Sequence, residues 1–176
     1  MSTSVLLILR AVHIIAGVLW AGTAVFYFFL VEPAVKSMGP VGPKFMQDLI
    51  EKRRYPLYMN VASALTIIAG ALLYWNTSGG LQSLWIQSGP GLGFTIGSVS
   101  AIGAYLVGFF MLRPRAERMG ALGKQIAMAG GSPEPAQSAE LQKLSQQIRS
   151  IERIDVILLT ISLFTMATAR YWWFAN

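Results

Sequence analysis

The chain contains a single histidine, His13, inside an apolar run that is long enough to cross a bilayer. An ionisable side chain at membrane depth is costly, so it marks a hypothetical functional site. On an α-helix, Arg10, His13, Gly17 and Trp20 share one face because they are three or four positions apart. Polar side chains within a membrane point into the helix bundle, so we expect this face to contact other helices and not lipid.

A second pair, near the C-terminus, mirrors this arrangement. Met166 lies about as far into the last apolar segment as His13 lies into the first, and Arg170 is one turn from Met166 as Arg10 is from His13. Haem iron accepts a single histidine or a histidine with a methionine. The four residues therefore suggest a haem b site with His13 as the metal ligand, Met166 as a second ligand and both arginines facing the propionates. The alternative is structural: His13 bonds a carbonyl or hydroxyl, Met166 fills the core, and Arg10 reaches the membrane interface.

The absence of a second histidine and of any cysteine narrows this chemistry. A single histidine counts against an intrinsic bis-histidine cytochrome, whereas a His–Met pair or five-coordinate iron stays open. Covalent c-type haem, iron–sulfur clusters and thiolate metal sites all need cysteine. Copper handling is the second candidate, since histidine and methionine bind copper, but the eight methionines are scattered. No nucleophile–base pair, phosphate loop or zinc motif is present, so the question of an enzymatic activity is left open.

The composition is that of an integral membrane protein. Of the 176 residues, 54% are hydrophobic and only 12% are charged, about half the charged share of a soluble domain. Four apolar segments approach the roughly 20 residues that span a hydrocarbon core: residues 5–31, 57–75, 92–112 and 156–173. We therefore predict an all-α fold, a four-helix transmembrane bundle that forms one domain over residues 1–176.

Lysine and arginine concentrate in two of the connecting segments, residues 32–56 and 113–155, whereas residues 76–91 carry no charge. Such basic loops lie on the cytoplasmic side of membrane proteins, which predicts that both termini lie outside. The net charge of +6 is then expected to attract anionic lipid headgroups at the cytoplasmic face, and not nucleic acid.

Local signals predict the boundaries of the helices. The residue before a proline disfavours helical dihedrals, so we expect the first helix to end or kink at Glu32 and Pro33. Helical spacing of apolar residues predicts a short interfacial helix over residues 44–54, and Gly and Pro predict a turn at residues 130–135. The apolar period that starts at Ser138 continues into the last span without a break, which predicts a helical cytoplasmic extension of that helix.

Small residues at spacings of about four in the third span permit close helix contact, which we expect to be used within the chain. A membrane-protein partner or a homo-oligomer is left open.

Glu32 is expected to be solvated. Glu152 and Asp155 lie beside Arg149 and Arg153, where ion pairs within one helix would account for them.

Residues 9–22, with Arg10, His13, Ile14, Trp20 and Gly22, resemble the first span of a group of small bacterial membrane proteins. The group comprises CopD-like copper-resistance proteins, uncharacterised integral membrane proteins related to them and, more distantly, HemJ-type protoporphyrinogen oxidase. Further likeness lies in Pro33, Arg53, Arg54, Arg113, Pro114 and residues 166–171.

The resemblance implies a multi-pass protein of the bacterial inner membrane. It implies copper uptake on the CopD-like branch and haem-linked oxidation of protoporphyrinogen on the HemJ-like branch. HemJ-like proteins carry a Tyr/Phe-Leu-Pro-Arg-Leu segment and a further histidine, whereas residues 28–33 of this chain read Phe-Phe-Leu-Val-Glu-Pro.

Overall fold

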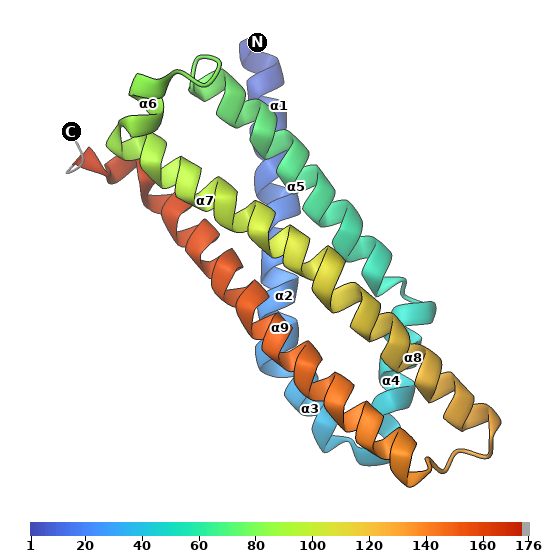
Figure 1. Ribbon diagram of the computed structural model, residues 1–176. Coiled ribbons are helices and arrows are strands. Elements are labelled where there is room, and N and C mark those ends of the chain that lie inside the picture. The colour runs from blue at the N-terminus through green and yellow to red at the C-terminus, as the bar shows by residue number, and fades with distance from the viewer. Residues whose placement is uncertain (174–176) are drawn as a thin grey trace.

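A computed structural model describes residues 1–173 of the protein, with Pro40 described by its backbone alone, and within this range every regular element is a helix (Figure 1). The predicted all-α class is therefore confirmed. The elements, with η for π- and 3₁₀-helices, are α1 (Thr3–Gly17), η1 (Val18–Gly22), α2 (Thr23–Phe26), η2 (Tyr27–Val31), α3 (Glu32–Ser37), η3 (Gly39–Val41), α4 (Gly42–Glu51), α5 (Tyr55–Thr77), α6 (Ser83–Gln87), α7 (Gly89–Leu106), η4 (Val107–Leu112), α8 (Arg113–Met128), α9 (Pro135–Thr168) and η5 (Ala169–Tyr171).

Three helical stretches are long and apolar enough to cross a membrane: Thr3–Ser37, Tyr55–Thr77 and Gly89–Met128. They contain the first three predicted spans. The predicted fourth span, residues 156–173, lies in the C-terminal part of α9 and continues through η5. The 34 residues of α9 form one uninterrupted helix, so the predicted N-terminal extension of the last helix is confirmed.

Of the end or kink predicted at Glu32 and Pro33, the end is not found: the helical stretch continues, and the π-helix η2 changes to α3 at that point. The stretch from α1 to α3 is continuous because the π-helix η2 immediately precedes α3, in which Pro33 occupies the first turn. The π-helix η4 precedes Pro114 of α8 in the same way. A π turn is wider than an α turn, so the proline ring is accommodated where it would otherwise clash with the preceding turn.

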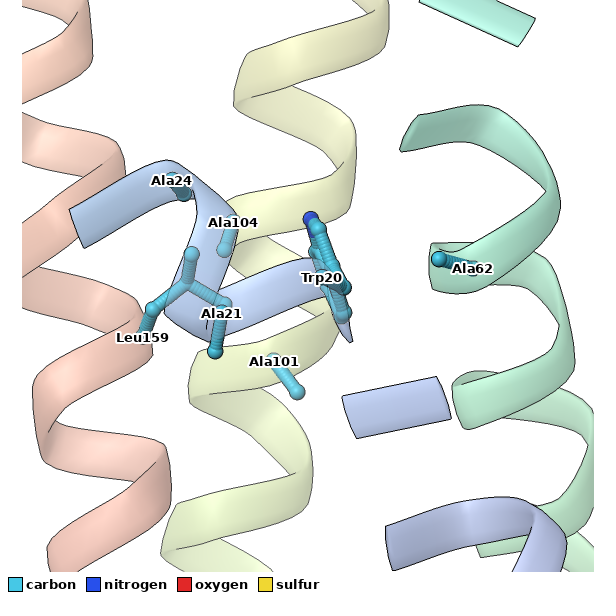
Figure 2. Packing of buried hydrophobic residues seen from close by; sticks show 7 residues of the cluster. All are labelled: Trp20, Ala21, Ala24, Ala62, Ala101, Ala104 and Leu159. Atoms are coloured by element: carbon cyan, nitrogen blue, oxygen red, sulfur yellow. The ribbon is translucent and has the colours of Figure 1, made fainter. Parts of the chain in front are cut away.

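The helices pack mainly as two pairs, α1 with α5 and α7 with α9. A cluster of buried residues joins the two pairs (Figure 2). Trp20 and Ala21 come from η1, Ala62 from α5, Ala104 from α7 and Leu159 from α9. Because most of these side chains are small, the helix backbones approach one another closely around the one large ring.

The small residues of α7 face α9 and η5, as predicted. A Cβ added at Gly93 would lie 2.8 Å from the Cβ of Ala169, and one added at Gly97 would lie 2.6 Å from the Cγ of Met166. This face is therefore filled within the chain.

The two basic connecting segments meet at one end of the molecule. The short helix predicted at residues 44–54 is α4, and the predicted turn lies between α8 and α9, where Gly130 and Gly131 have φ angles of 107° and 84°. Both termini lie toward the opposite end (Figure 1).

Candidate functional site

His13 of α1 binds the backbone of the neighbouring helix. Its Nδ1 lies 2.8 Å from the carbonyl oxygen of Thr66 in α5, and the ring is half-buried. Gly70, one turn further along α5, leaves room for the ring, since a Cβ there would lie 2.8 Å from Cε1 and 2.9 Å from Nδ1 of His13. The ring position therefore depends on a residue without a side chain.

This bond fixes the tautomer of the neutral imidazole. A carbonyl oxygen only accepts, so Nδ1 carries the hydrogen and donates, which leaves Nε2 with a free lone pair. No described residue donates a hydrogen bond to Nε2 or pairs with it. The bond satisfies a structural histidine, and it is equally the bond that orients histidines that ligate metals.

Of the other three predicted site residues, Arg10 lies one turn from His13 on α1, whereas Met166 and Arg170 lie in α9 and η5. Met166 packs against Gly97 of α7, and its sulfur accepts a weak hydrogen bond from Ser162, 3.9 Å away within α9. Arg10 and Arg170 are exposed. His13 thus belongs to the α1–α5 pair and Met166 to the α7–α9 pair, and none of the described hydrogen bonds or ion pairs joins any two of the four residues.

The surroundings of His13 contain an apolar groove and no cluster of further metal ligands. Across residues 1–173, no three His, Cys, Asp or Glu side chains gather in a way that could hold a metal ion. A groove of about 350 Å³ between α1 and α5 begins at Ala16, one turn from His13, and extends to Arg53 and Arg54, and His13 is not among its lining residues. The donor set at His13 is a single imidazole.

A second group of ionisable side chains lies where η2 and α3 pack against α9. Glu32 is only 8% exposed, so the expectation that it is solvated is wrong. Its carboxylate pairs with Lys36 at 2.6 Å and with Arg149 of α9. The Arg149 guanidinium also lies over the ring of Phe28, 4.9 Å from its centroid. The ion pairs therefore join the first long helix to the last.

Glu152 and Asp155 of α9 are also buried, at 8% and 9% exposure. The expected pairing within α9 is wrong for Arg149, because that residue reaches across to Glu32. Oε2 of Glu152 is buried and has no hydrogen-bond partner among the described atoms. Burial, followed by the charge of Glu32, raises the pKa of the Glu152 carboxyl to about 7, and burial raises that of Asp155 to about 7.

A signal for this group was present in the sequence. Leu144, Ile151 and Leu159 lie on the apolar stripe of α9. Asp155 lies four positions from both Ile151 and Leu159, and Glu152 lies seven from Leu159, so both carboxylates belong to the same face. Their charges suggest ion pairs with residues nearby in the sequence, whereas their position on the apolar stripe predicts that both side chains are buried.

Comparison with protein-family models, curated proteins and solved structures finds no match to this chain.

Proposed function

We propose that the protein is a four-span membrane protein of the bacterial inner membrane, with both termini outside, and that it binds haem b through His13 as the single axial protein ligand. The observation that carries the haem proposal is the bond from Nδ1 to the Thr66 carbonyl, which leaves the Nε2 lone pair available. The absence of a second histidine makes this a single-histidine site.

The chain's own residues would prepare the ligand. The Thr66 carbonyl fixes the ring plane and increases the electron density at Nε2, as second-shell acceptors do for other ligating histidines. Arg10, one turn away and exposed, supplies a positive charge for a propionate. When bound, haem would supply one-electron redox chemistry.

Copper transport, the alternative from the sequence, has less support. The contacts described for His13 are with Thr66 and Gly70, and neither is a copper ligand. An accessory subunit that used the small residues of α7 would find that face filled by Met166 and Ala169.

The fourth span is proposed because α9 packs along α7, which belongs to a stretch apolar enough to cross a membrane. Residues 156–168 of α9 are themselves uncharged. The basic segments meet at one end of the molecule, which supports assigning that end to the cytoplasm.

The visible spectrum tests the haem proposal. We expect the purified protein in lipid nanodiscs to give a Soret band with one equivalent of haem, and His13→Ala to lose it. Added imidazole should restore the band in His13→Ala, because a free ligand replaces a lost ligand but does not repair a lost structural bond. Met166→Leu is the control and should retain the band. Wild-type protein without a Soret band after titration with haemin would contradict the proposal.

A further inference from the structure

The buried charges between η2, α3 and α9 do not balance. We call this group the acidic cluster; it consists of Glu32, Lys36, Arg149, Glu152 and Asp155. If all five were ionised, three carboxylates would face two cations. Both cations bind Glu32 and reach solvent, since their side chains are 49% and 36% exposed against 10% for Glu32. No described cation is therefore paired with the carboxylate of Glu152 or Asp155.

Glu152 is the carboxylate that this charge imbalance leaves without a partner. Its Oε2 is fully buried without a hydrogen-bond partner among the described residues. An ionised carboxylate in that position would be unpaired in a medium of low dielectric constant, and such groups take up a proton. The ionisable groups that interact with its charge come from four elements: Tyr27 from η2, Glu32 and Lys36 from α3, Tyr55 from α5, and Arg149 and Asp155 from α9.

Two tyrosines also lie within range of the charge of Glu152. The rings of Tyr27 and Tyr55 stack with centroids 5.7 Å apart, and both are near enough to Glu152 for its charge to act on their phenol groups. The Tyr27 hydroxyl donates to the sulfur of Met46, 3.8 Å away, and so is directed to another residue. The Tyr27 hydroxyl is therefore not a donor to Oε2 of Glu152.

A proton suits this geometry better than a metal cation. A cation such as calcium or magnesium takes six or more oxygen ligands, whereas a proton needs one oxygen atom. The described acidic side chains form no group of three that could hold a metal ion. We propose that the acidic cluster is a proton-binding site, at the junction of the first and last long helices, in which Glu152 carries an exchangeable proton.

Occupancy of this site would control the packing of α3 on α9. With the proton bound, Glu152 is neutral, and Glu32 keeps Arg149 and Lys36 as its partners. Loss of the proton places a second negative charge beside Glu32 in the same buried volume. The pKa of Glu152, raised to about 7, sits above its value of about 4.5 in the unfolded chain. The folded state therefore binds the proton more tightly, so stability falls as pH rises between these values.

Isotope-edited infrared spectroscopy tests the proposal on the full chain in nanodiscs. Between about pH 5 and pH 9, the wild type should lose the carbonyl band of a protonated carboxyl with a midpoint near pH 7. Glu152→Gln should lose the part of this band that Glu152 contributes and keep the part from Asp155, whose pKa is also raised to about 7. Glu140→Gln on the same helix, whose partner Arg118 lies 2.7 Å away, should retain the whole band. The proposal is overturned if the wild type has no such band, or if Asp155→Asn removes all of it and Glu152→Gln leaves its intensity unchanged.

Carbodiimide labelling gives a second measurement that needs no variant. The reagent adds to protonated carboxyls, so mass spectrometry should find Glu152 modified at pH 6 and several-fold less at pH 9. Equal modification at both pH values would overturn the assignment. An infrared midpoint that moves when sodium replaces choline would also overturn it, because a metal cation would then compete for the site.

Discussion

Gly70 positions the ring of His13 because glycine has no side chain that would occupy the same space. Gly70 lets the imidazole of His13 lie against α5, where the Thr66 carbonyl is within hydrogen-bond distance. The tautomer, the ring plane and the free lone pair of His13 all follow from that approach. Gly70, which has no reactive group, thus determines which nitrogen of His13 is available as a ligand.

Gly70→Ala is expected to displace the ring. Its Cβ would lie 2.8 Å from Cε1 of His13, and overpacking of this kind costs about 1–3 kcal/mol, against ~1 kcal/mol gained in helix propensity. We expect lower stability in denaturant unfolding and weaker retention of haem. The control is Gly120→Ala in α8, where a Cβ meets nothing within 4 Å. Equal stability of the two variants would contradict this account.

His13 could be predicted from the sequence because a lone histidine in an apolar run is a local signal. Its partner could not, because a bond to the Thr66 carbonyl involves no side-chain chemistry that the sequence displays. The pairing of His13 with Met166 rested on matched depth alone. Depth along a membrane does not specify which helices are neighbours, and the two residues belong to different helix pairs.

At the scale of the elements, Arg149 joins α3 to α9 through Glu32, a residue 117 positions away. Lys36, the other partner of Glu32, lies beyond Pro33 because the helix continues past the proline. Apolar length predicted the long helices well because hydropathy is a property of each segment alone. The burial of Glu32 could not be predicted from apolar length. It depends on the π turn that precedes Pro33 and on the position of α9 beside this part of the chain.

Arg149→Met is expected to destabilise the protein strongly. Removing one partner of a buried ion pair costs about 3–5 kcal/mol, and we expect the lower end because Arg149 is itself 36% exposed. The matched control is Arg118→Ala, whose more exposed pair with Glu140 is expected to contribute about 1 kcal/mol or less. Chemical denaturation of both variants measures the difference. The double variant Arg149→Met, Glu32→Gln should recover part of the loss, and equal costs for the two single variants would count against the ion pair.

At the scale of the whole molecule, the chain places its termini at one end and its basic segments at the other (Figure 1). The positions of the lysine and arginine residues predict which end of the molecule faces the cytoplasm. The number of membrane crossings depends on whether the C-terminal part of α9 lies at the same depth in the membrane as α7. The chain has no cysteine, so a single introduced thiol reports its own position without background.

Ser132→Cys, in the turn before α9, and Trp173→Cys, beyond η5, are expected to lie on opposite sides of the membrane. In sealed spheroplasts an impermeant maleimide should label Trp173→Cys from outside and Ser132→Cys only after lysis. Ser83→Cys, in α6, is the control for the outer side. Labelling of Ser132→Cys and Trp173→Cys from the same side would show that α9 does not cross.

The π-helices have a consequence for how this chain tolerates insertions and deletions. Each wide turn holds roughly one residue more than an α turn, so η2 acts as a phase shift of about 100° between α2 and α3. Deleting one residue from 27–31 would restore an α-helix and keep Glu32 facing Arg149, because four α residues turn through about the same angle as the five residues of the π turn. Restoring the α-helix without a deletion would instead rotate Glu32 away from Arg149 by about 100°, although every side chain of the acidic cluster would still be present. Angular phase, as much as residue identity, therefore specifies the junction between the first and last helices.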